Sequence, residues 1–184
     1  MYKVRIYQEK DKDGVENVCV AASSRAKGKD SPWAKVILRL FCRYYIEMES
    51  EHCVVAVNEE DEVIGYVICA SNYDIWKENF KKFYLDTCED EETVSFGRMC
   101  IDGIEEYAKE YPAHLHINIH PNYQRQGIGN VLIEKLIEIL KAENIKGLML
   151  DVSATNEKGV NFYRKCRFEE IRKTEQDIIF GMKL

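Results

Sequence analysis

The chain has 184 residues with 26 basic and 32 acidic side chains, which gives a formal charge of −6 at pH 7. This length favours one domain, and 46% hydrophobic residues are enough for a sizeable core, so a disordered acidic tail is excluded. The acidic excess argues against a protein that binds nucleic acid through bulk positive charge. No uncharged apolar run reaches the length of about 18 residues that a membrane span needs, and the charged N-terminus predicts no secretory signal.

Seven cysteines are spread along the chain without a CxxC pair. Most of them lie in apolar stretches, where a free thiol behaves as a small hydrophobic side chain. This usage favours a reduced, cytoplasmic protein with neither a disulfide framework nor a structural zinc.

The first part of the chain is predicted to form short strands and helices. Alternating apolar side chains indicate strands, and Pro32 favours a helix start because proline suits the first helical turn. The expected elements are a strand at 2–8, a short helix at 15–24, a helix from Trp33 to about Glu49, and a β-hairpin at 53–71 whose turn is Asn58–Glu62.

Residues 72–112 follow without a Gly/Ser linker, so they are expected to elaborate a single domain that spans 1–184. A helix is expected at 72–85, with these side chains near one face: Ile75, Phe80, Phe83 and Tyr84. The acidic run at 86–92 predicts a solvated loop, and a second helix is expected at 102–110.

The remainder alternates strands and amphipathic helices, which indicates the α/β class. The expected strands are at 114–120, 148–154, 166–173 and 177–184, and the expected helices are at 127–142 and 156–166. The link between the strand at 114–120 and the next helix carries the most information.

This link contains the sequence Gln124-Arg125-Gln126-Gly127-Ile128-Gly129. Its two glycines let the backbone approach an anion closely, and the first helical turn presents unpaired N–H groups with partial positive charge. Successive amides of this kind can enclose a pyrophosphate. The spacing is neither the P-loop nor the Rossmann pattern, and a lone GxG before a helix would equally fit an ordinary tight turn.

The order of elements around this segment resembles the GCN5-related N-acetyltransferase (GNAT) superfamily, and two motifs over about residues 113–171 carry the resemblance. The acetyl-CoA motif is matched by Ile117, Ile119, Gln124, Gly127 and Gly129, and the motif after it by Asn156, Gly159, Tyr163, Arg167 and Phe168. The family implies a mixed, mostly antiparallel central sheet flanked by helices, with strands 4 and 5 splayed apart. The elaboration at 72–112 would then lie between strands 3 and 4.

Three positions depart from the patterns of the family. Gly159 stands where Ala is usual and costs the helix about 1 kcal/mol. Arg167 stands where Gly is usual, at a left-handed position that strains other residues by about 1–2 kcal/mol, so a differently shaped turn is expected there. Asn118 stands where related chains often carry an acid, and an amide cannot act as a base.

The resemblance implies acetyl-CoA as co-substrate and no metal. It assigns the pantetheine arm to the backbone of Ile117 and Ile119, with Asn156 in contact and Phe162 along the channel. The pyrophosphate would be held by the amides of Gln124, Arg125, Gln126, Gly127, Ile128, Gly129 and Asn130. Tyr163 matches the tyrosine that often gives a proton to the leaving CoA thiolate, a packed aromatic side chain being the alternative.

The catalytic base is expected among the histidines of the strand at 114–120. Alternation puts His114, His116, Asn118 and His120 on one face of that strand. The pair His114 and His116 is similar to the histidine pair of arylalkylamine N-acetyltransferases. The segment YPAHLHINI also resembles bacterial GNATs and the acetyltransferase-like domain joined to O-GlcNAc hydrolases. A structural histidine and a His-x-His zinc site are the other interpretations, and the zinc site lacks a visible third ligand.

The resemblance implies direct transfer of an acetyl group to the primary amine of a small-molecule acceptor. The alternative is a catalytically silent CoA-binding or interaction module. Neither nucleic acid nor a membrane is an expected partner, and the edge of the seventh strand is expected to allow pairing into a homodimer. The aromatic residues of the 72–85 helix, Trp76 among them, are expected either to face the core or to border the acceptor pocket. The acidic run at 86–92 could also attract a cationic amine.

Overall fold

The computed structural model describes residues 1–184 and is built around one seven-stranded sheet. The strands are β1 (Lys3–Ile6), β2 (Val54–Val57), β3 (Val63–Ala70), β4 (Ala113–Ile119), β5 (Gly147–Ser153), β6 (Glu169–Lys173) and β7 (Asp177–Lys183). They lie in the order β1-β2-β3-β4-β5-β7-β6, and every neighbouring pair is antiparallel except β4 and β5. The predicted mixed, mostly antiparallel sheet is confirmed.

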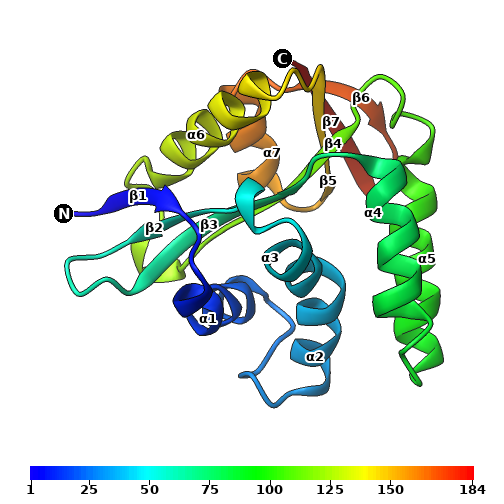
Figure 1. Ribbon diagram of the computed structural model, residues 1–184, viewed down its shortest axis with the longest axis horizontal. Helices are drawn as coiled ribbons and strands as arrows, with labels where there is room; N and C mark the ends of the chain where they lie inside the picture. The colour runs from blue at the N-terminus through cyan, green and yellow to red at the C-terminus, as the bar shows by residue number, and fades with distance from the viewer.

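Helices cover both faces of this sheet (Figure 1). They are α1 (Lys12–Ala22), α2 (Pro32–Leu38), α3 (Tyr44–Met48), α4 (Tyr73–Phe80), α5 (Glu91–Glu105), α6 (Ile128–Ala142) and α7 (Glu157–Lys165). Strand side chains alternate between a core shared with α1–α5 and a core shared with α6 and α7. None of these helices has both the length and the apolar character needed to cross a membrane.

The helix expected from Trp33 to about Glu49 is present but irregular. Ser31 caps its start, because its Oγ accepts a hydrogen bond from the backbone N–H of Ala34 at 3.2 Å. Between α2 and α3 the chain forms a π-helical turn, Arg39–Arg43. Such turns widen the helix by one residue and change which side chains share a face. The π-helical turn therefore sets the directions of the side chains that follow it, Tyr45 included.

The predicted buried face of the 72–85 helix is partly wrong. Ile75 and Phe83 are exposed, at 58% and 45% of their surface, whereas Tyr73, Trp76, Phe80 and Tyr84 are buried. The buried set follows a spacing of three or four residues through α4, and a second π-helical turn at Lys81–Leu85 extends it. Apolar character alone was therefore a poor guide to which residues of this helix face inward.

The helix expected at 102–110 begins much earlier, at Glu91, and ends at Glu105. Asp90 caps it by accepting a hydrogen bond from the backbone N–H of Thr93 at 3.0 Å, and acidic residues fill its first turn. Carboxylates stabilise a helix N-terminus through capping and through the helix dipole. The end of the acidic run is thus a helix start, and only its first part is a loop.

The seventh strand is not an edge of the sheet, so the expectation of pairing through it is wrong. β7 lies between β5 and β6, because β6 turns back on it as an antiparallel hairpin. The edge strands are β1 and β6. A homodimer stays a prediction without that support.

The turn after α7 forms regularly although it contains Arg167, so the expected change of shape is wrong. Arg167 has a φ of 68°, the left-handed conformation that the sequence predicted. The N–H of Phe168 bonds the carbonyl of Tyr163 at 3.1 Å, and the N–H of Arg167 bonds that of Arg164 at 3.1 Å. These are the two bonds of a Schellman motif, which fixes Tyr163 despite the strain.

Arg167→Gly is therefore expected to stabilise the protein. Relief of about 1–2 kcal/mol of strain exceeds the entropy of about 0.4–1 kcal/mol that glycine adds to the unfolded chain. We expect the melting temperature to rise by about 2 °C in a thermal unfolding experiment. Lys165→Gly, inside the last turn of α7, is the control and should lower it. A lower melting temperature for Arg167→Gly would contradict the claim that Arg167 is strained in the folded state.

Stability should also depend on His52, which is buried between Glu49 (3.4 Å) and Glu143 (2.8 Å). Burial alone would lower the pKa of His52, but its contacts with the two carboxylates outweigh burial and raise the pKa to about 9. In the unfolded chain the pKa of His52 is about 6.5. The stabilisation of the folded state by protonated His52 is therefore complete below pH 6.5 and is lost as the pH rises through about 9. Denaturant titrations should show this decline, and His52→Gln should remove it.

Candidate active site

The strands β4 and β5 separate soon after they meet. Only Ala113 with Leu148 and His114 with Met149 are paired between them, while β4 stays paired with β3 as far as Ile119. The predicted splay is confirmed. Beyond His114, the side of β4 that faces β5 has no strand partner, and Ile117 and Ile119 lie in this open stretch.

The glycine loop before α6 presents a row of free backbone donors. Arg125 (φ 64°) and Gly127 (φ 80°) are both left-handed, and the N–H groups from Gln124 to Gly129 donate no hydrogen bond within the protein. The Gln124 side chain donates to the carbonyl of Ile119 at 3.2 Å, which ties the loop to β4. Asn130 differs from the other predicted residues, because its N–H bonds the carbonyl of Gly127 at 3.1 Å.

These residues fit the phosphates of CoA. Alternation of left-handed and ordinary backbone curls successive N–H groups around one anion, at the positive end of the α6 dipole. A Cβ at Gly129 would lie 2.9 Å from the Phe162 ring, so the glycine lets Phe162 pack against the first turn of α6. A Cβ at Gly127 would meet nothing, and that glycine serves the left-handed backbone alone.

The helix α7 holds two further predicted residues. Asn156 caps it by accepting a hydrogen bond from the N–H of Gly159 at 3.0 Å, and a Cβ at Gly159 would lie 2.6 Å from the Asn156 amide. This close approach accounts for glycine in place of the usual alanine. Tyr163 packs against Phe168 and Phe180, and its hydroxyl makes no hydrogen bond. Burial raises the pKa of Tyr163, so the hydroxyl keeps its proton.

The histidine pair of β4 is joined through Tyr45. The Tyr45 hydroxyl lies 3.0 Å from Nε2 of both His114 and His116. Burial lowers the pKa of His116 to about 4, and burial next to His116 lowers that of His114 well below its usual value. Both rings are therefore neutral at pH 7, and the hydroxyl donates to one while it accepts from the other.

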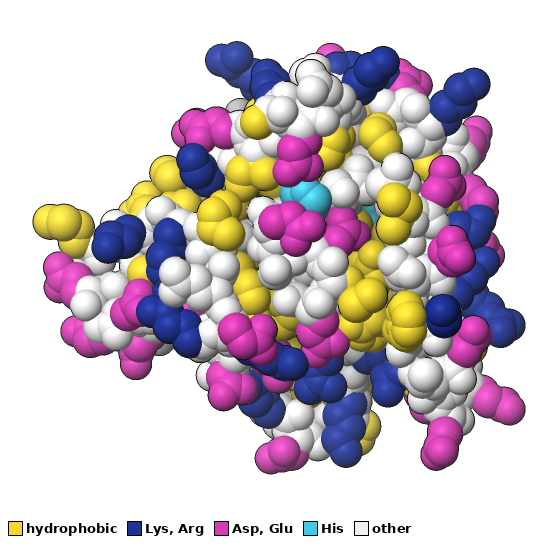
Figure 2. All heavy atoms as spheres, in the orientation of Figure 1, with side chains coloured by type: hydrophobic (Ala, Val, Ile, Leu, Met, Phe, Trp, Pro, Cys, Tyr) yellow, Lys and Arg dark blue, Asp and Glu magenta, His cyan; other side chains and the backbone are white.

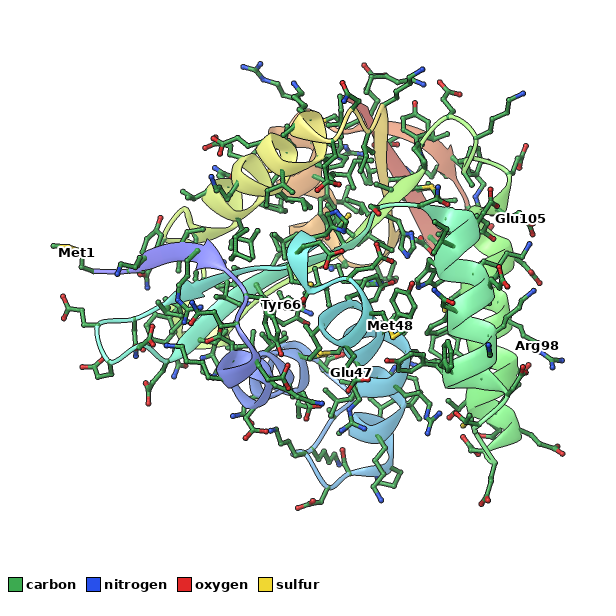
Figure 3. The ribbon with its side chains drawn as sticks, in the orientation of Figure 1. Met1, Glu47, Met48, Tyr66, Arg98 and Glu105 are labelled. Carbon is green, nitrogen blue, oxygen red and sulfur yellow. The ribbon has the colours of Figure 1, made fainter.

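The other two polar residues of that strand face are engaged elsewhere. The amide of Asn118 donates to the hydroxyl of Tyr66 at 2.8 Å, and Tyr66 extends from β3 on the side of the sheet that α1 and α3 cover (Figure 3). Nδ1 of His120 accepts from the N–H of Asn122 at 3.3 Å. No cluster of three or more His, Cys, Asp or Glu side chains is arranged to hold a metal ion.

Asp151 is a candidate that the sequence interpretation missed. It lies on β5, where Asp177 is the cross-strand partner of Ser153, two residues further along β5. Burial raises the pKa of Asp151 to about 6, the Asp177 carboxylate adds to the rise, and Arg172 opposes it. No side chain forms a hydrogen bond or an ion pair with it, and the residue is exposed to solvent at the mouth of the splayed strands. The available signal was one acid within the apolar run LMLDVSA.

Two cavities meet at this carboxylate. One, of about 280 Å³, is lined by three residues predicted to act on acetyl-CoA: Ile117, Asn156 and Tyr163. The other, of about 350 Å³, lies on the side of α3, α4 and α5. Both are lined by Phe41, Leu115, His116, Asp151 and Ser153. The two cavities therefore adjoin at Asp151 and His116.

Comparison with known families agrees with this geometry. The sequence profile of the Acetyltransferase (GNAT) family matches residues 19–168. The chain belongs to the GNAT family. Its splayed strands and glycine loop are accordingly the GNAT arrangement that the motifs predicted.

Several relatives of this GNAT chain are known. It is 32% identical over 74 residues to the ribosomal protein bS18-alanine N-acetyltransferase of Escherichia coli K12, which is 40% of this chain and 50% of that protein. The Salmonella typhimurium protein of the same name is 30% identical over 73 residues, 40% of this chain and 49% of that protein. The chain thus spans about half the length of the curated relatives it matches.

Solved structures share the fold. SsHAT superposes with a TM-score of 0.88 at 22% identity, covering 99% of this chain and 98% of that one. The PaiA N-acetyltransferase of Thermoplasma acidophilum, solved in complex with coenzyme A, gives a TM-score of 0.63 at 16% identity, covering 100% and 99%. At these identities the likeness concerns the fold alone.

Proposed function

We propose that this GNAT chain is an acetyl-CoA-dependent N-acetyltransferase that acts directly on the primary amine of a small molecule. The observation that carries the proposal is that two cavities adjoin at Asp151 and His116. Residues predicted to contact acetyl-CoA line one of them. Membership of the GNAT family supports the same activity.

Acetyl-CoA supplies the activated acyl group, and the chain holds and orients it. The free amides of Gln124–Gly129 would bind the pyrophosphate, and the open backbone of Ile117 and Ile119 would bond the pantetheine arm as a neighbouring strand does. Asn156 and Phe162 would flank that arm, between β4 and α7. A backbone N–H near Ile117 would stabilise the negative oxygen that develops during transfer.

Asp151 is the base that we propose in place of the histidines. A base works best when its pKa is close to the working pH, and a carboxylate with a pKa near 6 meets this condition better than His116 with a pKa near 4. Asp151 takes the proton that the amine loses as its nitrogen bonds the carbonyl carbon. The hydrogen-bonded set of His114, His116 and Tyr45 then acts as a positioning group in the wall beside Asp151.

Tyr163 is the proposed proton donor to the sulfur as the carbon–sulfur bond breaks. Tyr163→Phe keeps the packing and removes only the hydroxyl, so kcat should fall while the affinity for CoA stays the same. A thiolate is already a good leaving group, so we expect a loss of only about tenfold, below the usual range for general acid catalysis. Steady-state kinetics and calorimetric CoA binding measure the two effects. An unchanged kcat would assign Tyr163 to packing alone.

The proposal is tested first with the unmodified protein. CoA at 100 times its Kd should stabilise the folded state by about 2.7 kcal/mol, which is a rise of about 5–10 °C in melting temperature. Release of free thiol from acetyl-CoA should then depend on an added amine. The absence of any CoA-dependent shift would contradict the proposal.

Two other functions have specific support. The similarity to the ribosomal protein bS18-alanine N-acetyltransferases favours a protein N-terminus as acceptor, and a peptide beginning with alanine would be its substrate. Asn118, which stands where related chains often carry an acid, favours a silent CoA-binding module. In that case CoA would raise the melting temperature while no amine released thiol.

A further inference from the structure

The larger cavity is walled by helices that the acetyl-CoA motifs do not include. Leu40, Phe41 and Tyr45 reach it from the segment around the π-helical turn between α2 and α3, Trp76 from α4, and Phe96 and Ile104 from α5. The sheet closes the other side with His116 and Asp151. The space-filling view shows hydrophobic side chains gathered between α3 and α4 (Figure 2). Residues 72–112 therefore build an acceptor wall rather than only a core face.

The volume of the cavity limits what can enter it. About 350 Å³ is near the lower end of the range for small-molecule sites, about 300–1,000 Å³. It equals roughly a dozen times the volume of about 30 Å³ that one water occupies in the liquid. A compact molecule fits inside such a space, whereas most of an extended peptide would lie outside it, beyond the side that is open to solvent.

The chemistry of the lining differs between the two ends. The helix side is aromatic and aliphatic, and the polar groups there are committed, because the Tyr45 hydroxyl bridges His114 and His116. The charged side chains of the lining are Asp151 and Asp177. Asp177 is already paired with Arg172 at 2.9 Å, whereas Asp151 has no cationic partner.

This asymmetry selects a ligand with one positive end. The Asp151 carboxylate attracts the ammonium form of an amine, which gives one proton to solvent and attacks as the neutral amine, and a flat apolar body finds aromatic rings against which it can stack. A second charge would have to enter the apolar end without a partner, which costs several kcal/mol or more for a desolvated ion. A carboxylate next to the amine would face Asp151 and Asp177 and be repelled.

We infer that the acceptor is a primary monoamine on a short linker to an aromatic body, with no other charge. The inference rests on the proposed function and narrows its substrate class. It excludes polyamines and α-amino acids as preferred acceptors because they carry a second charge. It excludes peptide N-termini because of their size.

A panel of amines with acetyl-CoA tests the substrate class. 2-Phenylethylamine should show a kcat/KM at least 100-fold above that of spermidine, phenylalanine or a hexapeptide beginning with alanine. Phenylalanine is the closest control, because it adds only a carboxylate to the same aromatic amine. Preference for spermidine or the peptide would overturn the inference and leave acetyl transfer intact. Thiol release with none of these amines would count against both.

Binding to the CoA complex tests the cavity without relying on turnover. Cys100 lines the cavity on α5, so Cys100→Phe fills part of it, whereas its neighbour Met99 is 67% exposed. Figure 3 shows Arg98 and Glu105 on the outer side of the same helix. Calorimetry should show a Kd for 2-phenylethylamine at least tenfold higher in Cys100→Phe and unchanged in Met99→Phe. No binding, or equal binding to both variants, would overturn the inference.

Discussion

Replacing Asp151 with asparagine should lower kcat/KM about 10³-fold while the affinity for CoA stays unchanged. The substitution keeps the size of the side chain and removes its ability to take a proton, and a positioned base contributes about 10²–10⁴-fold. Asp151 lines both cavities, and Asp177, the other carboxylate of the larger cavity, is already paired with Arg172, so it does not replace Asp151. Steady-state kinetics with a responsive amine, together with calorimetric CoA titration, separate chemistry from binding.

The pH profile gives an independent test of the same role. A base must be deprotonated, so kcat/KM should rise with pH through about 6, the pKa to which burial raises Asp151. Asp177 adds to that rise, so Asp177→Asn should move this limb to lower pH. A limb that stays in place in Asp177→Asn and persists in Asp151→Asn would point to another base.

Gly127→Glu should abolish most of the affinity for CoA. The substitution puts a carboxylate beside free amides that otherwise hold phosphate, and it strains a left-handed residue. Loss of charge-assisted hydrogen bonds worth about 1.5–3 kcal/mol corresponds to a Kd about 10²-fold higher. Calorimetric titration of CoA measures the change directly.

The chain contains a matched control for that experiment. Gly28 is also left-handed, at φ 91°, and a Cβ there would meet nothing, as at Gly127. Gly28→Glu should therefore cost similar stability and add the same charge without changing the Kd for CoA. Equal weakening of CoA binding by both variants would trace the effect to general destabilisation or net charge.

The predictions for the acetyl-CoA side of the site rest on local signals. Gly127 and Gly129 predict a backbone that can approach an anion closely, and the alternation of side chains along β4 places His114 and His116 on one face. The structure confirms the splay of β4 and β5. It also explains Gly159, because a Cβ at that position would clash with the Asn156 side chain. These are properties of short segments, and short segments are what a sequence shows.

The cavity proposed for the acceptor depends on contacts between distant residues. Tyr45 meets His114 from 69 positions away, and nothing in a helical tyrosine suggests such a partner. In the sequence, Asp151 looks like an ordinary polar residue of a strand. Only the separation of β4 and β5 in the structure shows that it borders a cavity. The outward turn of Ile75 and Phe83 depends on how α4 packs, which apolar content does not specify.

The aromatic wall of the larger cavity and the predicted CoA contacts lie in different parts of the chain. The aromatic wall of the larger one comes from residues between Leu40 and Ile104, whereas Ile117, Asn156 and Tyr163 of the smaller one come later. Under the proposed function, a change confined to this aromatic wall would alter the acceptor and leave the glycine loop before α6 untouched.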